Sequence, residues 1–429
     1  MPCTGPRRRV VVTGYGMVTP LGRDAEATFS QAVQGHSGIK RISSFDVRGL
    51  PCAIAGQVED SWLQGKDRGD RGARFVARAV KLMLVAATEA AHAAALADVG
   101  DRGRVAAVIG CHGANPSVEE VIFLHRFTDE LGRWNADGLS RAGGYDAQQF
   151  FRRKPDVATA LVAAAFDCRG PSLTLVSACA AGAQAIGEAR RLIVDGACDV
   201  ALAGGCEATV DFVGVVGFSL LRALAERFTS PESASRPFDR RRSGFVLSEG
   251  AGALVLEERG HALSRGARVL GEVLGYGDST DAYRITDSRP DGAGAELAMQ
   301  GALADAGISP AEVEYVNAHG TSTVQGDIAE TRAIEHVLGP RAREVPVSSN
   351  KSMLGHTIAA AGAIEAALTL MGMERSIILP TINHDFPDPR CNLDYVPNVA
   401  RPQPHRVALS NSFGFGGQNA SLCLGRLDA

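Results

Sequence analysis

Short runs of Val, Ala, Leu and Ile alternate with longer Ala-rich stretches along most of the chain. Short continuous apolar runs are typical of strands buried on both faces, and the longer stretches between them are typical of crossover helices. We therefore expect an α/β protein. The predicted strands span residues 10–13, 105–109, 173–177, 200–203, 253–256, 313–317, 345–348 and 407–410. The predicted helices span residues 74–97, 180–195, 292–306, 328–338 and 359–375.

The chain has 429 residues, which is enough for two cores, because single cores seldom grow beyond about 250 to 300 residues. A polar stretch at residues 257–268 predicts a boundary between halves of residues 1–257 and 258–429. No long flexible linker separates them, so we expect the halves to pack as one body. Several predicted strands end in Gly, Ser, Cys or His just before a helix, which is where α/β proteins bind ligands.

Charge and cysteine content narrow the class of protein. The net charge is only −4, which gives no overall attraction to nucleic acid. No signal-like apolar core or span of about 20 apolar residues is found, so neither export nor membrane insertion is expected. Nine cysteines without CxxC pairs fit a reduced, cytoplasmic protein. Most are expected to be small buried side chains, but Cys111 is left open because His112 follows it.

Gly14 and Gly16 follow the first predicted strand and superficially resemble a dinucleotide-binding turn. The third small position is occupied by Thr19, and no acidic residue closes a second strand at the expected distance. We interpret the two glycines as a tight turn after the strand. No bound cofactor is expected.

Cys179 is the candidate nucleophile. The predicted strand 173–177 leads into SACAAG at residues 177–182, where a helix begins. The helix dipole and free N–H groups favour a thiolate, so we expect a lowered pKa for this cysteine. Taken alone, a cysteine before an Ala-rich helix is more often a packing residue, and the case for catalysis depends on two further motifs.

Two histidines follow predicted strands and adjoin glycine, His319 in NAHGTST and His356 in SMLGH. Two neutral imidazoles can donate hydrogen bonds to one thioester carbonyl and stabilise the enolate that forms when a malonyl group loses carbon dioxide. Zinc binding is the rival use of such residues. No third ligand recurs at metal-ligand spacing near either loop, so we expect no metal site.

Polar side chains flank both histidines. Lys351 precedes His356 and Glu365 follows it on the next predicted helix. A buried pair of these two charges would hold the loop and keep His356 neutral, and solvated surface charges are the alternative. The hydroxyl groups of Thr321 and Thr323 could bind the amide groups of a phosphopantetheine arm.

A Gly-rich segment, NSFGFGGQN at residues 411–419, surrounds Phe415. The backbone N–H near Phe415 could pair with that of Cys179 to form an oxyanion hole, while the Phe415 ring gates an acyl pocket. A plain turn with a packed phenylalanine is the alternative.

Together these motifs resemble the β-ketoacyl-acyl carrier protein synthases of the KAS II type and the ketosynthase subunits of type II polyketide systems. The resemblance covers nearly the whole chain and rests on VVVTGYGMVTPLG, GPSLTLVSACAAGAQAIGEA, DVALAGGCEA, SRPFDRRRSGFVLSEGAGALVLEE, DAY at residues 281–283, YVNAHGTSTVQGD, SSNKSMLGH and SNSFGFGGQN. It implies a thiolase-like fold of two similar βαβ-rich halves, packed as a layered α-β-α-β-α body.

The resemblance also implies chemistry. Cys179 is acylated, His319 and His356 assist decarboxylation and condensation, and Lys351 and Glu365 support them. The reaction is a decarboxylative Claisen condensation with malonyl-acyl carrier protein, in fatty acid or type II polyketide synthesis. The family pattern adds two substrate-binding residues, Asp327 of the GD motif and Phe415 as the gating aromatic.

The implied partner is an acidic acyl carrier protein, which brings the phosphopantetheine arm. The candidate docking charges are Arg71, Arg74 and Arg222. The assembly is expected to be a homodimer, or a heterodimer with a ketosynthase-like chain-length subunit.

Two alternatives to a condensing enzyme are weighed against the motifs. A non-catalytic chain-length subunit would lack the cysteine nucleophile, and a thiolase would carry a second cysteine near residues 412–416. Residues 110–169 depart from the family pattern, being longer and lacking its Gly-rich turn. In the family this region lines the acyl pocket and the dimer interface, so acyl chain length and pathway stay open.

Overall fold

The structure is a computed structural model that describes residues 7–63, 76–145 and 148–426. None of the helices in these ranges is both long and apolar enough to cross a membrane. The strands are β1 Val10–Val18, β2 Ile39–Arg41, β3 Ile54–Gly56, β4 Val105–Cys111, β5 Ser172–Leu175, β6 Val200–Glu207, β7 Gly250–Glu258, β8 Gly271–Thr280, β9 Tyr315–Asn317, β10 Val347–Ser348, β11 Ile377–Ile378, β12 Arg401–Pro402, β13 Val407–Phe413 and β14 Gln418–Gly425. The α-helices are α1 Ala25–Val33, α2 Arg78–Ala93, α3 Val118–His125, α4 Ala136–Ala142, α5 Gln148–Arg152, α6 Asp156–Phe166, α7 Ala181–Val194, α8 Phe212–Leu220, α9 Arg259–Ser264, α10 Ala293–Ala306, α11 Val324–Leu338, α12 Lys351–Leu354 and α13 Ala361–Arg375.

Ten strands form the main sheet, in the order β10-β9-β13-β14-β8-β1-β7-β6-β4-β5. The same arrangement occurs twice, once outward from β1 and once outward from β8: two antiparallel pairings are followed by two parallel pairings. Within the described part of the chain, the two sets of five strands pair only between β1 and β8, where Val11 and Val12 face Glu272 and Gly271. The chain therefore contains two βαβ-rich halves of one topology.

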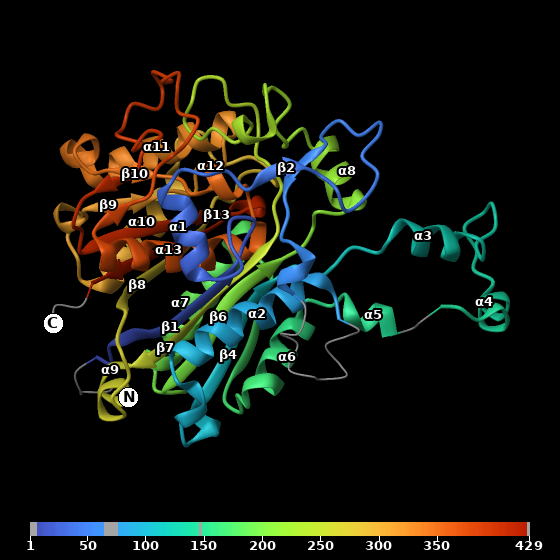
Figure 1. Ribbon diagram of the computed structural model, residues 1–429, viewed down its shortest axis with the longest axis horizontal. Helices are drawn as coiled ribbons and strands as arrows, with labels where there is room; N and C mark the ends of the chain where they lie inside the picture. The colour runs from blue at the N-terminus through green and yellow to red at the C-terminus, as the bar shows by residue number, and fades with distance from the viewer. Residues whose placement is uncertain (1–6, 64–75, 146–147, 427–429) are drawn as a thin grey trace.

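Helices lie between and outside the two sets of strands (Figure 1). Helices α7 and α13 pack against each other and contact strands of both sets, and every residue of α13 from Ala361 to Met373 is buried. Helices α2 and α6 cover the strands of the first set, and α10, with α11 beside it, covers those of the second. This is the layered α-β-α-β-α order expected of a thiolase-like fold.

Every predicted strand and helix overlaps an observed element, but the interpretation of Gly14 and Gly16 as a turn is wrong. Both glycines lie inside β1. A Cβ atom at either position would come within 2.3 Å of a backbone oxygen of α2, that of Ala90 or Ala86. The glycines let α2 approach the strand, because no side chain fits between them.

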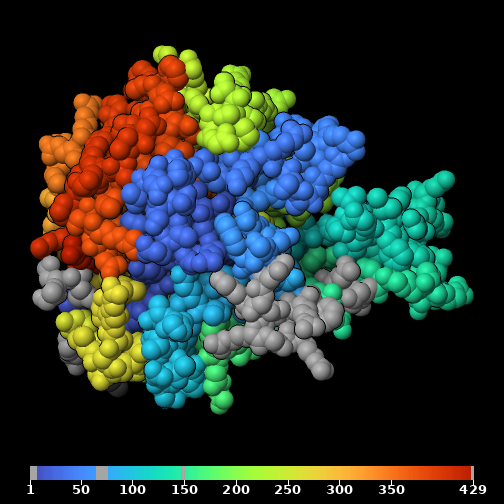
Figure 2. All heavy atoms as spheres, viewed as in Figure 1, coloured from blue at the N-terminus to red at the C-terminus, as the bar shows by residue number. Residues whose placement is uncertain are grey.

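Part of the segment 110–169, which was expected to depart from the family pattern, forms an arm. Helices α3, α4 and α5 project away from the layered body, as Figures 1 and 2 show in teal. At the base of the arm, Glu120 is buried and pairs with Arg153, and Tyr145 donates to the same carboxylate over 3.3 Å. Several large apolar side chains stay exposed on it: Val121, Ile122, Leu131, Trp134, Phe150 and Phe151.

Candidate active site

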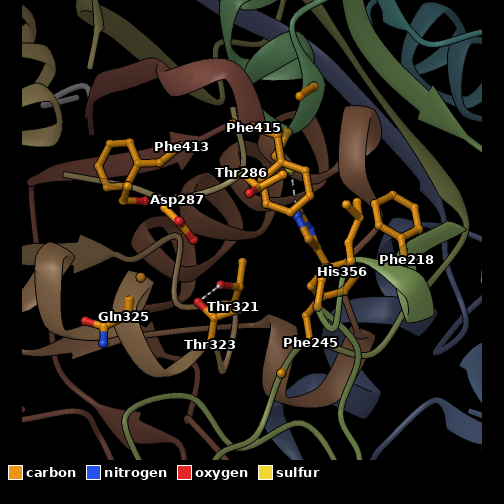
Figure 3. A pocket seen from close by; sticks show the side chains of 18 of the residues that line it. Phe218, Phe245, Thr286, Asp287, Thr321, Thr323, Gln325, His356, Phe413 and Phe415 are labelled. Carbon is orange, nitrogen blue, oxygen red and sulfur yellow. Dashed lines mark hydrogen bonds between the residues drawn. The ribbon is translucent and has the colours of Figure 1, made fainter. Parts of the chain in front are cut away.

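A cavity of about 450 Å³ opens where segments from both halves meet. Much of its wall comes from the segments that follow β4, β5, β8, β9, β10 and β13, and the rest includes Phe218 of α8 and residues 221–223 and 243–245. Figure 3 shows Thr321, Thr323, His356 and Phe415 around this space. Side chains that are distant in the sequence therefore meet at the strand ends, where ligand sites of α/β proteins are built.

Cys179 lies on a tight turn between β5 and α7. Residues Ala178–Ala180 form one 3-10 turn before α7 begins at Ala181. Ala178 has a φ of 49°, a left-handed conformation that a residue with a side chain rarely adopts and that is typical of strained functional turns. The Cys179 Sγ atom lies 2.9 Å from Nε2 of His356.

The prediction of a lowered thiol pKa is wrong. Burial raises the pKa of Cys179 to about 12, although the charge of Lys351 and the backbone N–H groups of Phe415 and Cys179 itself oppose the shift. The residue is only 4% exposed, and its turn precedes α7 rather than forming its first helical turn. Desolvation therefore outweighs the helix dipole, and the resting sulfur is a neutral thiol.

His319 and His356 face each other across the cavity. Their ring centroids are 5.3 Å apart and their planes nearly perpendicular, at 84°. Burial, and next the charge of Lys351, hold the pKa of both imidazoles well below the usual value, so both are neutral. One ring nitrogen of each lies with Sγ of Cys179 in a group whose members are all within 4.8 Å of one another, a spacing and donor set that an ion such as Zn²⁺ would also accept.

Lys351 and Glu365 form an ion pair inside the protein. Nζ and Oε1 are 2.5 Å apart, and each side chain is about 2% exposed, so neither is a surface charge. Burial raises the pKa of Glu365, and the charge of Lys351 opposes the shift. The pair connects α12, which leads to His356, to the buried helix α13.

Glu330 supports the first histidine loop and was not singled out from the sequence. Its carboxylate accepts hydrogen bonds from the backbone N–H groups of His319 and Gly320, each 2.8 Å long. Burial raises the pKa of Glu330 to about 7. Nothing in the predicted helix 328–338 distinguishes it, because Glu335 and other polar residues share that helix.

Thr321, Thr323 and Phe415 all line the cavity. The two hydroxyl groups lie 3.1 Å apart, shown by a dashed line in Figure 3. The Phe415 ring lies 6.4 Å from that of Phe218, and the backbone N–H of Phe415 is close enough to Sγ of Cys179 to favour its anion. The two backbone N–H groups predicted to form an oxyanion hole, those of Cys179 and Phe415, therefore both lie near the sulfur.

Asp327 is buried and is not among the residues that line the cavity, so its role in substrate binding stays a prediction. Its carboxylate accepts from the backbone N–H groups of Phe238 (2.7 Å) and Ser322 (3.1 Å), and Arg242 lies 3.4 Å away. Burial raises the pKa of Asp327 to about 6. It positions the loop that carries Thr321 because it satisfies buried backbone donors.

The candidate docking residues are placed only in part. Arg222 is exposed at the cavity and has a φ of 53°. Arg71 and Arg74 lie outside the described residues.

Cys111, which was left open, is a free and buried cysteine, and His112 beside it lines the cavity. His112 follows β4, and its Nδ1 atom lies 2.7 Å from the carboxylate of Glu207 at the end of the neighbouring strand β6.

The chain matches family models over most of its length. Residues 7–262 match the N-terminal domain of beta-ketoacyl synthases, and residues 270–385 match their C-terminal domain. A protein named 3-oxoacyl-[acyl-carrier-protein] synthase 2 from Synechocystis sp. is 40% identical over 421 residues, covering 97% of each chain. A protein of the same name from Staphylococcus aureus is 38% identical over 441 residues, covering 98% of this chain and 99% of the relative.

Comparison with solved structures points to the same family as the sequence matches. The chain superposes with a TM-score of 0.87 on a type II PKS ketosynthase solved in complex with its acyl carrier protein, at 33% identity, covering 99% of this chain and all of that one. It superposes with a TM-score of 0.86 on the ishigamide ketosynthase/chain length factor, at 34% identity, with the same coverage. The resemblance found in the sequence is therefore confirmed, and the chain belongs to the β-ketoacyl synthase family.

Proposed function

We propose that this protein is a β-ketoacyl-acyl carrier protein synthase, which loads an acyl group onto Cys179 and extends it by decarboxylative Claisen condensation. The observation that carries the proposal is the 2.9 Å distance between Sγ of Cys179 and Nε2 of His356, with His319 facing the same space. Family membership and relatives named as 3-oxoacyl synthases support this reading.

In the first half-reaction, the thiol of Cys179 attacks the thioester carbonyl of an acyl carrier protein. Because the resting thiol is neutral, its proton passes to Nε2 of His356 as the sulfur–carbon bond forms. The backbone N–H groups of Cys179 and Phe415 stabilise the oxyanion. The bond to the carrier sulfur then breaks, and the imidazole returns the proton to the departing carrier thiolate.

In the second half-reaction, malonyl-acyl carrier protein enters the cavity. His319 and His356, both neutral and with the proton of His356 now on Nε2 after a change of tautomer, donate hydrogen bonds to its thioester oxygen while the carboxylate leaves as carbon dioxide. The resulting enolate carbon attacks the acyl thioester on Cys179, the bond between that carbonyl and the cysteine sulfur breaks, and the thiolate takes up a proton from water. The cation of Lys351 favours neutral imidazoles throughout this step.

The acyl carrier protein is the proposed partner in both half-reactions. Thr321 and Thr323 offer hydroxyl groups along the path to Cys179, where they would bind the amide groups of the phosphopantetheine arm. Arg222, exposed at the cavity, would attract an acidic carrier protein. It would raise the rate of association more than the affinity. The free, buried cysteines of the described ranges support a cytoplasmic location.

We further propose a dimer with a second ketosynthase-fold chain, either another copy or a chain-length subunit. Strand β5 ends the sheet, and no strand of the described residues pairs with its outer edge, where Leu173 and Val176 are 39% and 55% exposed. Exposed apolar edges invite pairing with another chain. If the chain is expressed alone, light scattering should give twice its 44.9 kDa for a homodimer, whereas a monomer supports the heterodimer.

Two Cys179 variants separate a condensing enzyme from a non-catalytic chain-length subunit. Cys179→Ala and Cys179→Gln should lose condensation but keep decarboxylation of malonyl-acyl carrier protein, because both histidines remain. His319→Ala serves as the matched control and should lose decarboxylation as well. Unchanged condensation by Cys179→Ala would reject Cys179 as the nucleophile.

A further inference from the structure

The covalent intermediate of the proposed reaction needs protection from water. After the first half-reaction, the acyl group stays on Cys179 until malonyl-acyl carrier protein arrives, as a thioester that water can hydrolyse. Nε2 of His356 lies 2.9 Å from Sγ, where it can take a proton from an attacking water just as it does from the thiol. Active sites suppress such side reactions by keeping water away from the intermediate.

Ile358 combines a branched side chain with a backbone conformation that disfavours one. It begins a 3-10 turn, Ile358–Ala360, two residues after His356, and its φ is 43°. A positive φ is a genuine outlier for a β-branched residue, whereas glycine and asparagine adopt this conformation far more readily. Residues held in such conformations are concentrated at functional sites.

The turn that carries the nucleophile shows that this conformation does not require an isoleucine. Residues Ala178–Ala180 form the equivalent 3-10 turn before α7, as Ile358–Ala360 do before α13, and the two turns pack against each other. Their first residues share the left-handed conformation, with a φ of 49° at Ala178 and 43° at Ile358. The sequences also run in parallel, ACAAGA at residues 178–183 and IAAAGA at residues 358–363. Because alanine occupies the first position of one turn, the backbone does not account for the branched residue in the other.

The side chain of Ile358 lies in the wall near the nucleophile. It lines the cavity, and it belongs to the same cluster of buried apolar residues as Cys179 and Phe245. The ring of Phe245 meets that of His356 edge-on, with ring centroids 5.2 Å apart (Figure 3). Apolar groups therefore adjoin both the thiol and the imidazole. They offer no hydrogen bonds, and a site must supply about two to four of these to hold a water molecule.

We propose that the side chain of Ile358 keeps water from the acyl thioester on Cys179, and so decides whether the acyl group condenses or is hydrolysed. In hydrolysis the oxygen of a water attacks the thioester carbonyl, and one water proton passes to Nε2 of His356. The bond between the carbonyl carbon and the sulfur then breaks, and the sulfur takes that proton. The products are a free carboxylic acid and the thiol of Cys179. This inference rests on the proposed acylation of Cys179 and adds a residue that protects the intermediate.

The lifetime of the acyl-enzyme without malonyl-acyl carrier protein tests the inference. The protein is acylated with hexanoyl-pantetheine and freed from excess donor by rapid gel filtration, and intact-mass spectrometry follows the loss of the acyl mass. Ile358→Ala should shorten the lifetime at least about 10-fold. Ile358→Asn, which suits the left-handed backbone and brings a polar group for water, should shorten it as well. Ile358→Val keeps the branched Cβ and should have nearly the lifetime of the unaltered protein.

Ile54→Ala is the matched control. Ile54 belongs to the same apolar cluster and is 4% exposed, against 3% for Ile358, but it is not among the residues that line the cavity. The same side-chain truncation there should leave the lifetime unchanged. Only acylated molecules are counted, so the lifetime does not depend on how much of a preparation is folded, and Ile358→Asn gives the reading if Ile358→Ala does not fold.

Two results would overturn the inference: acyl-enzymes of Ile358→Ala and Ile358→Asn that last as long as that of the unaltered protein, or an equal shortening in Ile54→Ala. Failure of the proposed function looks different, because the unaltered protein then carries no acyl group on Cys179 at all.

Discussion

Breaking the buried Lys351–Glu365 pair should destabilise the protein, and replacing the whole pair should not. The two side chains are about 2% exposed and 2.5 Å apart, so Lys351→Met leaves a carboxylate without its counter-charge. Removing one partner of such a pair typically costs about 3–5 kcal/mol. Burial already raises the pKa of Glu365, so its carboxylate should take up a proton in Lys351→Met. The loss of stability should therefore lie near the lower end of this range.

The expected change in melting temperature follows from chain length. Unfolding entropy of about 2.1 cal/mol/K per residue, over 429 residues, makes each kcal/mol worth roughly 1 °C. Lys351→Met should therefore melt about 3 °C lower by differential scanning fluorimetry. The double variant Lys351→Met/Glu365→Leu fills the site with apolar groups and should recover most of that loss.

In the double variant, stability should recover but catalytic activity should not. The double variant lacks the cation that lowers the pKa of both imidazoles and the pair that holds the His356 loop. Its kcat for condensation should stay at least about 10-fold below that of the unaltered protein although its melting temperature recovers. A double variant that melts no higher than the single one, or that condenses normally, would refute this role for the pair.

Three further outcomes are expected. Glu330 has a pKa of about 7 and accepts hydrogen bonds from the backbone N–H groups of His319 and Gly320. Protonation below pH 7 removes one acceptor, so the kcat of the unaltered protein should fall as the pH is lowered through 7. Glu330→Gln should have a lower kcat that no longer changes over this pH range. Gly16→Val places a side chain 2.3 Å from a backbone oxygen of α2 and should destabilise the fold by at least about 1–3 kcal/mol in denaturant unfolding, whereas Ala at the exposed Gly100 should not. Added Zn²⁺ should bridge the thiol and the two imidazoles and stop acylation, and EDTA should restore it; acylation that is indifferent to Zn²⁺ would contradict the spacing of the three groups.

The periodicity of the sequence predicts much of the fold because buried parallel strands are continuous apolar runs. It misses β8, since Gly275 and Gly277 interrupt the apolar pattern just as Gly14 and Gly16 obscure the length of β1. In each strand a helix backbone approaches within about 2 Å of where a Cβ would stand. Such close packing depends on a tertiary contact, which no local pattern contains.

The sequence predicts some residues of the site but not others. Motif residues at strand ends, such as Cys179 and His319, can be found because strand ends gather ligand sites. The raised pKa of the thiol could not be predicted, since it depends on burial by elements from both halves. Glu330 and Glu207 act through backbone groups or through a histidine far away in the sequence, so only coordinates reveal them.

The most direct measurement of the central claim is peptide mapping of the protein after reaction with an acyl-acyl carrier protein. We expect the acyl mass on the peptide containing Cys179, and its release as a chain two carbons longer when malonyl-acyl carrier protein is added. An acyl group on a different residue, or a modified Cys179 that malonyl-acyl carrier protein does not discharge, would contradict it.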